Sequence, residues 1–446
     1  MTGFSGGTQK HAPECWLNGT CASETVTEIA QNIKIETLAN GLTLLVESMP
    51  WLESAAFSVS VPGGCKMDPV DKIGLANLTC EMVQRGCGSR NSRQYVEDLE
   101  RLGTDIHSSV SISHTSFGAS MPAASLEKTL SIFSDVVRNP HLPESQIEDG
   151  RQVCYQEIRA AEDDLAQKTM QELRRRRYAE PFGRNATGTM ESVAGLTADD
   201  IRSCFQQNYQ PSGMILAVAG NVDFESLKNH VGQLFGDWEP RPPADVQETP
   251  AVGGNHHIQH DSQQTHIGLA YPSVPYSDPD YFLARGSVGV LSDGMSSRLF
   301  TEVREKRGLC YTVYASMHSM RDRGSVIVYA GTSAERAQET LDVTVEELLR
   351  LGKGIEESEL DRLKVSIRSS LVMQQESSRS RASSIAGDFY HLGKVRTLDE
   401  LTGIILGLTV EKINGYVADH PPRDFNVVTL GPHPLEEPSG ISTASA

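Results

Sequence analysis

The segment from Gly74 to Gly86 constrains this chain of 446 residues most, because it predicts a short, largely apolar helix with one polar face. Asn77, Cys80 and Glu81 occupy positions i, i+3 and i+4, so they project from the same side of that helix. Two ligands one turn apart with a carboxylate beside them form a common scaffold for zinc-dependent hydrolysis. Asparagine is a poor zinc ligand and cysteine a poor general base, so the segment predicts the frame of a metal site without its chemistry.

The order Gly-Leu-Ala-x-x-x-x-x-Met in this segment, followed by x-x-x-Gly, resembles the zinc helix of the insulinase and pitrilysin peptidase family. In that family the motif His-x-x-Glu-His binds zinc through its histidines and activates water through its glutamate. The resemblance places the first histidine at Asn77, the general base at Cys80 and the second histidine at Glu81. The third zinc ligand corresponds to Glu157, in the segment Val-Cys-Tyr-Gln-Glu-Ile. We therefore expect neither a bound metal nor a catalytic residue in this chain.

A strand is predicted over residues 104–112, after a helix over residues 92–103. In the family that the chain resembles, the strand at this place is an exposed edge, and a substrate peptide adds to it through backbone hydrogen bonds. The family's usual Asn-Ala pair corresponds here to His107 and Ser108. Because the backbone part of that role survives any side chain, the resemblance implies that these two residues bind substrate.

Residues 296–311 carry the strongest resemblance to the family, in an amphipathic helix that stops at Gly308 and leads into a strand rich in Tyr and Val. Arg304 and Tyr311 lie on either side of this junction. The resemblance implies that both reach the substrate that is held at the zinc helix. A guanidinium offers fixed, paired donors to peptide carbonyls, and a phenol can donate to a developing oxyanion.

The pattern of strands and helices occurs twice, which predicts an α+β fold of two homologous domains, each a mostly antiparallel sheet covered by helices. The resemblance implies that the two domains form half of a clamshell. We expect a flexible leader over residues 1–32, a first domain with the degenerate motif over 33–238 and a linker over 239–254. A second domain with Arg304 and Tyr311 follows over 255–433, and residues 434–446 form a flexible tail. Residues 147–177 are expected to form one long helical run, with four arginines at its end.

The formal net charge of −18, from 40 Lys and Arg against 58 Asp and Glu, argues against a nucleic-acid partner. Residues 1–34 lack an apolar core of signal-peptide length and no later segment is apolar enough to cross a bilayer, so a cytoplasmic location is expected. The eight cysteines are scattered, which suits reduced thiols. His256 and His260 are expected on a polar edge strand rather than in a metal cluster.

Members of this family often work as two chains, one with His-x-x-Glu-His and the other with the Arg and Tyr, as in the bacterial and mitochondrial processing peptidases. The leading hypothesis is a non-catalytic subunit that completes the active site of a homologous, zinc-bearing partner chain acting on peptides. The first alternative is a non-proteolytic structural or peptide-binding protein, like the core proteins of the respiratory bc1 complex. The second is a solitary hydrolase whose altered metal site uses Glu81 and Glu157, with Cys80 or Cys154.

Overall fold

The computed structural model describes residues 31–242 and 245–438, and the folded unit begins at Asn32. Of the expected leader, only residues 31 and 32 are among the described residues, and of the expected tail only residues 434–438 are. Cys15 and Cys21 lie outside the described part of the chain. The other six cysteines are all buried and free, in agreement with the expectation of reduced thiols.

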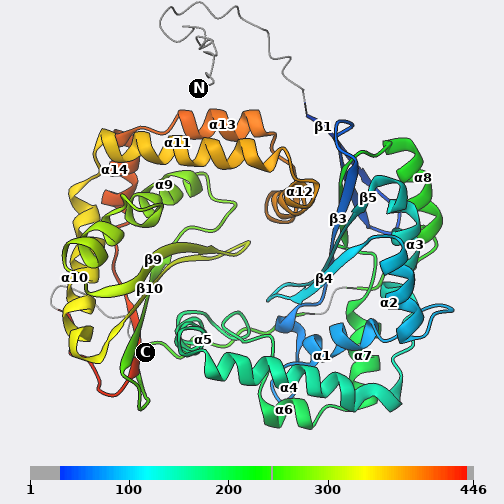
Figure 1. The fold of residues 1–446 in the computed structure, drawn as a ribbon, viewed down its shortest axis with the longest axis horizontal. Helices are drawn as coiled ribbons and strands as arrows, with labels where there is room; N and C mark the ends of the chain where they lie inside the picture. Colours follow the sequence, from blue (N-terminus) through cyan, green and yellow to red (C-terminus); the bar gives the residue numbers. More distant parts are fainter. Residues whose placement is uncertain (1–30, 243–244, 439–446) are drawn as a thin grey trace, which may run out of the picture. The chain divides into compact units, whose positions relative to one another are not determined.

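The first half of the chain contains a six-stranded sheet with the strand order β1-β2-β6-β3-β5-β4 (Figure 1). Only β2 and β6 pair in parallel, so the sheet is mostly antiparallel, as expected. The hairpin between the first two strands turns at Gly41, whose φ of 88° favours glycine. The strands are β1 (Asn32–Thr37), β2 (Thr43–Ser48), β3 (Ser54–Pro62), β4 (Asp105–Val110), β5 (His114–Pro122) and β6 (Ile215–Gly220).

The second half contains a five-stranded sheet with the order β7-β11-β8-β10-β9, which repeats the order β2-β6-β3-β5-β4 strand for strand. The one parallel pair, β7 with β11, corresponds to β2 with β6. The predicted internal repeat is therefore present, and β4 and β9 are equivalent edge strands. The strands are β7 (His256–Gln259), β8 (Gln264–Ser273), β9 (Cys310–Ser319), β10 (Gly324–Ser333) and β11 (Asn426–Gly431). His256 lies on β7, an edge strand as expected, whereas His260 follows the end of that strand at Gln259.

Helices cover both sheets. Those of the first half are α1 (Leu75–Val83), α2 (Ser92–Arg101), α3 (Leu126–Arg138), α4 (Ile147–Asp163), α5 (Leu165–Arg177), α6 (Met190–Ala194), α7 (Ala198–Asn208) and α8 (Phe224–Phe235). Those of the second half are α9 (Tyr281–Ser292), a π-helix (Phe300–Lys306), α10 (Ala337–Arg350), α11 (Glu357–Gln374), α12 (Ser378–Leu392), α13 (Leu398–Leu406) and α14 (Val410–Asp419). Short 3₁₀ turns are η1 (Cys65–Met67), η2 (Ala123–Ser125), η3 (Glu144–Gln146), η5 (Ala334–Arg336) and η6 (Leu351–Lys353).

The prediction of one long helical run over residues 147–177 is wrong in one respect, because the run is divided into two helices at Asp164. This residue has extended backbone angles, and its carboxylate accepts a hydrogen bond from the backbone N–H of Gln167 at 3.0 Å. Aspartate is a strong helix N-cap, so it ends α4 and starts α5. The consequence is spatial, because α5 leaves the first sheet and packs against β8 and β11 of the second.

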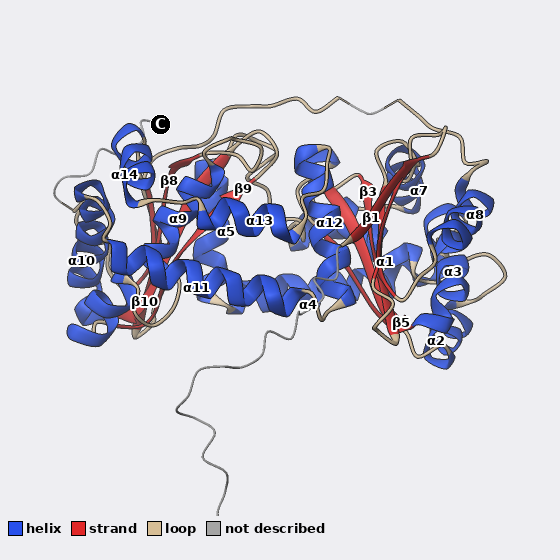
Figure 2. Ribbon diagram, turned by 90° about the horizontal axis from the view of Figure 1, so that it is seen from above, coloured by secondary structure: helices blue, strands red, loops and turns tan. Residues whose placement is uncertain are grey.

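The two halves exchange one helix each. While α5 of the first half packs on the second sheet, α12 of the second half packs on β3 and β6 of the first (Figure 2). Met170 and Leu173 of α5 share a buried cluster with Ile327 of β10, and Ile385 of α12 shares one with Ala217 of β6. Each sheet is thus covered by an exchanged helix on one face.

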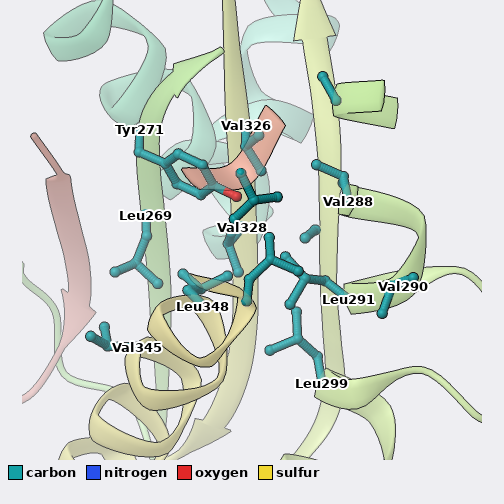
Figure 3. Close-up of a cluster of buried hydrophobic side chains, with 14 of the residues drawn as sticks. Leu269, Tyr271, Val288, Val290, Leu291, Leu299, Val326, Val328, Val345 and Leu348 are labelled. Carbon is teal, nitrogen blue, oxygen red and sulfur yellow. The ribbon is translucent and has the colours of Figure 1, made fainter. Parts of the chain in front are cut away.

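The opposite face of each sheet carries the main core of that half. In the second half, Leu269 and Val328 from the strands pack with Leu291 of α9 and Leu348 of α10 (Figure 3). A corresponding cluster of the first half lies between its sheet and α2, α3 and α8. Within the described residues, none of the helices combines the length and apolar character that spanning a membrane requires.

Candidate functional site

Helix α1 starts at a sharply defined point. Gly74 caps it with a φ of 96°, and a Cβ there would lie only 2.8 Å from the carbonyl oxygen of Thr187. The Asp68 carboxylate accepts hydrogen bonds at 2.9 Å from the backbone N–H groups of Gly74 and Ala76. The two carboxyl oxygens satisfy helix donors that lack an intrahelical partner, while burial raises the pKa of Asp68 to about 7. The predicted helix is confirmed, and its first turn is held rigidly.

The polar face of α1 meets α4 at Asn77. Its amide Nδ2 donates to Oε2 of Glu157 at 2.7 Å and lies 3.7 Å from Sγ of Cys154. Asn77 and Glu157, which correspond to the first and third zinc ligands, are therefore in direct contact, as a shared site requires. Because the asparagine amide nitrogen donates a hydrogen bond to the Glu157 oxygen, that oxygen is not free to bind a metal.

The other two motif positions are also engaged. Oε1 of Glu81 pairs with the guanidinium of Arg85, one turn further along α1, at 2.7 Å. Cys80 is 4% exposed and packs in the core of the first half. Burial raises the pKa of the Cys80 thiol to about 12, and burial together with the Glu157 charge raises that of Cys154 to about 12. Both thiols are therefore protonated near neutral pH and are not thiolate ligands.

These residues do not fit zinc. The Asn77 amide donates to Glu157, Arg85 pairs with Glu81, and neither histidine position of the motif carries an imidazole, so the set lacks the free donors that zinc sites use. Among residues 31–242 and 245–438, no group of three or more His, Cys, Asp and Glu side chains is placed to hold a metal. The same contacts argue against the altered metal site built on Glu81 and Glu157.

The predicted edge strand is confirmed as β4, which pairs only with β5. His107 is exposed, and its ring lies over Gly118 of β5, where an added Cβ would be 2.1 Å from the ring. Its Nδ1 also contacts the guanidinium of Arg379 from α12, and that guanidinium pairs with Asp105 at 3.1 Å. Partial burial and the Arg379 charge lower the pKa of His107, so the imidazole is neutral near pH 7.

Ser108 connects the edge strand to the degenerate helix. Nε2 of Gln84 donates to Oγ of Ser108 at 3.0 Å and to the carbonyl of Cys80 at 2.9 Å. The edge strand and α1 are thus fixed to each other. This hydrogen bond adds to the packing contacts between α1 and β4.

The second predicted site lies at the junction of the π-helix with β9. The helix is held in place by Arg298, which makes two hydrogen bonds to the Glu359 carboxylate, at 2.7 and 2.8 Å, and is 7% exposed. Gly308 ends it with a φ of 60°. A π-helical turn in place of an α-helix is uncommon and occurs frequently at functional sites.

Arg304 and Tyr311 come together at this junction. The Arg304 guanidinium lies 4.7 Å from the ring centroid of Phe300 and 5.2 Å from that of Tyr311. Tyr311 is 82% exposed. In the described structure Arg304 makes no ion pair, whereas its neighbours Lys306 and Arg307 both pair with Glu302. The guanidinium is thus oriented by two rings and keeps its donors available.

Two family models match this chain in succession. The insulinase model of peptidase family M16 matches residues 43–189, and the model of the peptidase M16 inactive domain matches residues 195–366. This chain belongs to the M16 peptidase family.

Similar proteins agree with that assignment. A Rickettsia felis protein named "Uncharacterized zinc protease" is 26% identical over 385 residues, which cover 86% of this chain and 93% of the relative. The crystal structure of a peptidase M16 inactive domain from Pseudomonas fluorescens has a TM-score of 0.82 at 22% identity and covers 91% of this chain and 100% of its own. A chain of complex III2 from Candida albicans has a TM-score of 0.75 at 18% identity, covering 90% and 96%. The structural similarities show a shared fold.

The two M16 matches divide the candidate residues between them. Asn77, Glu157 and the edge strand fall in the insulinase match, while Arg304 and Tyr311 fall in the inactive-domain match. Within the described residues, no hydrogen bond or ion pair joins the two groups, so each is a separate cluster on its own half.

Three contact residues of this M16 chain were not predicted from its sequence. Phe300 stacks on Arg304, Gln84 joins α1 to β4, and Arg379 reaches β4 from the exchanged helix. Phe300 precedes Arg304 by one helical turn, a spacing that could have indicated the contact. Gln84 also follows Asn77 at the seven-residue helical spacing, whereas no local pattern places Arg379 beside β4.

Proposed function

We propose that this M16 chain is the non-catalytic subunit of a heteromeric zinc peptidase and contributes Arg304 and Tyr311 to peptide hydrolysis by a homologous partner. The observation that supports it most is the contrast between the two clusters. The zinc positions Asn77 and Glu81 are occupied by internal partners, whereas Arg304 is stacked, unpaired among the described residues, and next to an exposed phenol.

In this proposal the partner chain holds the zinc through its His-x-x-Glu-His motif, and the metal supplies the activated water. The residues of this chain bind and orient. Arg304 donates to carbonyl oxygens of the substrate backbone, because a guanidinium offers several donors in a fixed plane. The Tyr311 hydroxyl donates to the oxygen that becomes negatively charged as the peptide bond is attacked.

The edge strand β4 supplies a further element of the proposal. Its unpaired backbone groups can receive an extended peptide as an added strand, with His107 and Ser108 beside it. The contact of Arg379 with His107 places a charge from α12 next to that edge. We further propose that the chain acts in the cytoplasm, where its six described free cysteines stay reduced.

A steady-state assay of the purified complex with a peptide substrate tests the role of the second cluster. Arg304→Ala with Tyr311→Phe is expected to lower kcat/KM about 100-fold or more, since removal of a single oxyanion donor has effects of that size. The matched control is Arg307→Ala with Tyr314→Phe, which changes the same residue types on the same helix and strand. Full activity of the Arg304 and Tyr311 variant would contradict the proposal.

The contacts of α1 also favour a second candidate, a structural or peptide-binding M16 protein that cleaves nothing. All polar residues of the degenerate motif are paired internally or buried, which is what a purely structural helix requires. The same preparation separates the two functions. A zinc chelator abolishes any hydrolysis that depends on zinc. If the complex binds peptide but shows no such zinc-dependent hydrolysis, the chain is a structural or peptide-binding protein.

A further inference from the structure

A cavity of about 870 Å³ lies apart from both clusters described above. It is lined by residues of η1, the start of β5, the end of α12 and the tip of the β9–β10 hairpin. Asn77, Glu157, Arg304 and Tyr311 are not among its lining residues. Its volume is in the range of cavities that bind small ligands or short peptide segments.

The cavity gathers basic side chains around one aromatic ring. The ring of Tyr390 lies edge-on to that of His114, with centroids 4.1 Å apart, and 4.8 Å from that of His391. The Arg321 guanidinium lies 5.9 Å from the Tyr390 centroid. Lys66 lines the same cavity. These groups come from four separate elements, so the fold assembles them.

The electrostatic effect of this gathering is visible at His114. Burial lowers the pKa of its imidazole to about 4, and the charges of Lys66, His391 and Arg321 act in the same direction. Burial is the main cause of this lowering, and the three neighbouring charges add a local positive potential to it. That is unexpected in a chain with a net charge of −18.

Neither cation of the cavity forms an ion pair in the described structure, although the Asp322 carboxylate acts electrostatically on Lys66. Asp322 also lines the cavity, but it pairs with Arg323 at 2.7 Å, and Arg323 in turn pairs with Glu248. In the described part of the chain, the side chains of Lys66 and Arg321 form no ion pair or hydrogen bond. Lys66 is partly buried and Arg321 is exposed, so the cost of an unpaired cation, which an anionic ligand would relieve, falls mainly on Lys66.

The rest of the wall indicates what else the ligand carries. Apolar side chains line much of it: Met67, Phe182, Ile215, Met320 and Phe389. Amide side chains of Gln207 and Asn208 lie among them and offer polar contacts. The combination suits a ligand with an apolar body, amide groups and one negative charge.

We propose that this cavity binds the carboxylate of an apolar peptide segment through Lys66 and Arg321, with the apolar wall holding the neighbouring side chains. The carboxylate is inferred from the cavity alone, and the choice of a peptide rests on the proposed function. The carboxylate comes from a C-terminus or from an acidic side chain, since both present the same group to the two cations.

Calorimetric titration of the isolated chain tests this with three tetrapeptides. The first is acetyl-Ala-Leu-Phe-Ala with a free C-terminal carboxylate, the second is the same peptide amidated, and the third is amidated with Glu in place of Leu. Charged hydrogen bonds predict that a carboxylate-bearing peptide binds about 10- to 100-fold more tightly than the neutral one. Preference for the first or the third peptide identifies a C-terminal or a side-chain carboxylate.

Two variants locate the effect. Lys66→Met with Arg321→Met is expected to abolish the preference for a carboxylate, while Lys364→Met with Arg368→Met, which removes two charges on α11 outside the cavity, should leave it unchanged. The chain with Arg304→Ala and Tyr311→Phe should also keep the preference, so failure of the proposed function and of this inference can be told apart.

Three results would overturn the inference. One is equal binding of the acidic and neutral peptides, or no saturable binding of either acidic peptide at millimolar concentration. Another is a carboxylate preference that persists after Lys66→Met with Arg321→Met. The third is tighter binding of octanoate than of both acidic peptides, which would assign the cavity to a fatty acid.

Discussion

The buried ion pair between Arg381 and Glu47 gives the sharpest prediction about the fold. It joins the exchanged helix α12 to β2 of the first sheet, with Nε of the arginine 2.8 Å from Oε2 of the glutamate. The two side chains are 1% and 4% exposed. The terminal nitrogens of Arg381 are buried without a hydrogen-bond partner in the described structure, so the protein does not satisfy all the donors of this guanidinium.

Arg381→Ala removes the positive charge and leaves the Glu47 carboxylate in the core without it. This is expected to lower the free energy of unfolding by about 3–5 kcal/mol, the usual cost of breaking a buried pair from one side. Replacing both residues, by Arg381→Met with Glu47→Leu, should cost much less, because no buried charge remains and apolar groups fill the space. The measurement is urea unfolding followed by circular dichroism, with the midpoint and slope compared among variants.

The exposed pair of Arg93 and Glu97 provides the control, since the Arg93 side chain is 87% exposed and 2.6 Å from its partner. Arg93→Ala should change the unfolding free energy by about 1 kcal/mol or less. A loss below about 1 kcal/mol for Arg381→Ala, or an equal loss for the double variant, would contradict the assumption that this buried charge needs its partner.

Two further predictions concern protons and metal. Burial lowers the pKa of His114 and of His318 to about 4, below their ordinary value, so the folded chain binds fewer protons than the unfolded chain between about pH 6.5 and 4. The contribution of these two histidines to stability is complete above that window and is lost as pH falls through it, by on the order of 3 kcal/mol for each histidine. His114→Phe should therefore make the midpoint of urea unfolding less sensitive to pH. Asn77→His with Glu81→His should place two imidazoles one turn apart next to Glu157 and raise the zinc content, measured by elemental analysis after dialysis, to about one ion per chain. A zinc content no higher than that of either single variant would contradict the geometry described for α1 and α4.

Local patterns in the sequence predicted most of the elements. Helix α1 and the edge strand β4 lie within the segments expected for them, because apolar periodicity and glycine stops are local signals. The family resemblance, rather than a local pattern, singled out Asn77 with Glu157 and Arg304 with Tyr311, and the members of each pair are neighbours in the structure.

Features that depend on distant contacts could not be predicted. Nothing near Arg381 in a serine-rich helix shows that Glu47, 334 residues away, will bury it. The exchange of α5 and α12 likewise depends on contacts between each helix and a distant sheet, which no local pattern predicts. The local sequence signal for it in the first half is the helix cap at Asp164. The cavity around Tyr390 was missed for the same reason, because Lys66, His114 and Arg321 come from separate parts of the chain.

The central claim is that this chain works with a zinc-bearing homologue. Its most direct test is purification of the tagged full-length chain from its native cells, followed by mass spectrometry of what binds to it and elemental analysis of the complex. The account predicts a homologous M16 chain with an intact His-x-x-Glu-His motif in equal amount, with zinc in proportion to that chain. Recovery of the chain alone, or only with proteins that lack the motif, would contradict it.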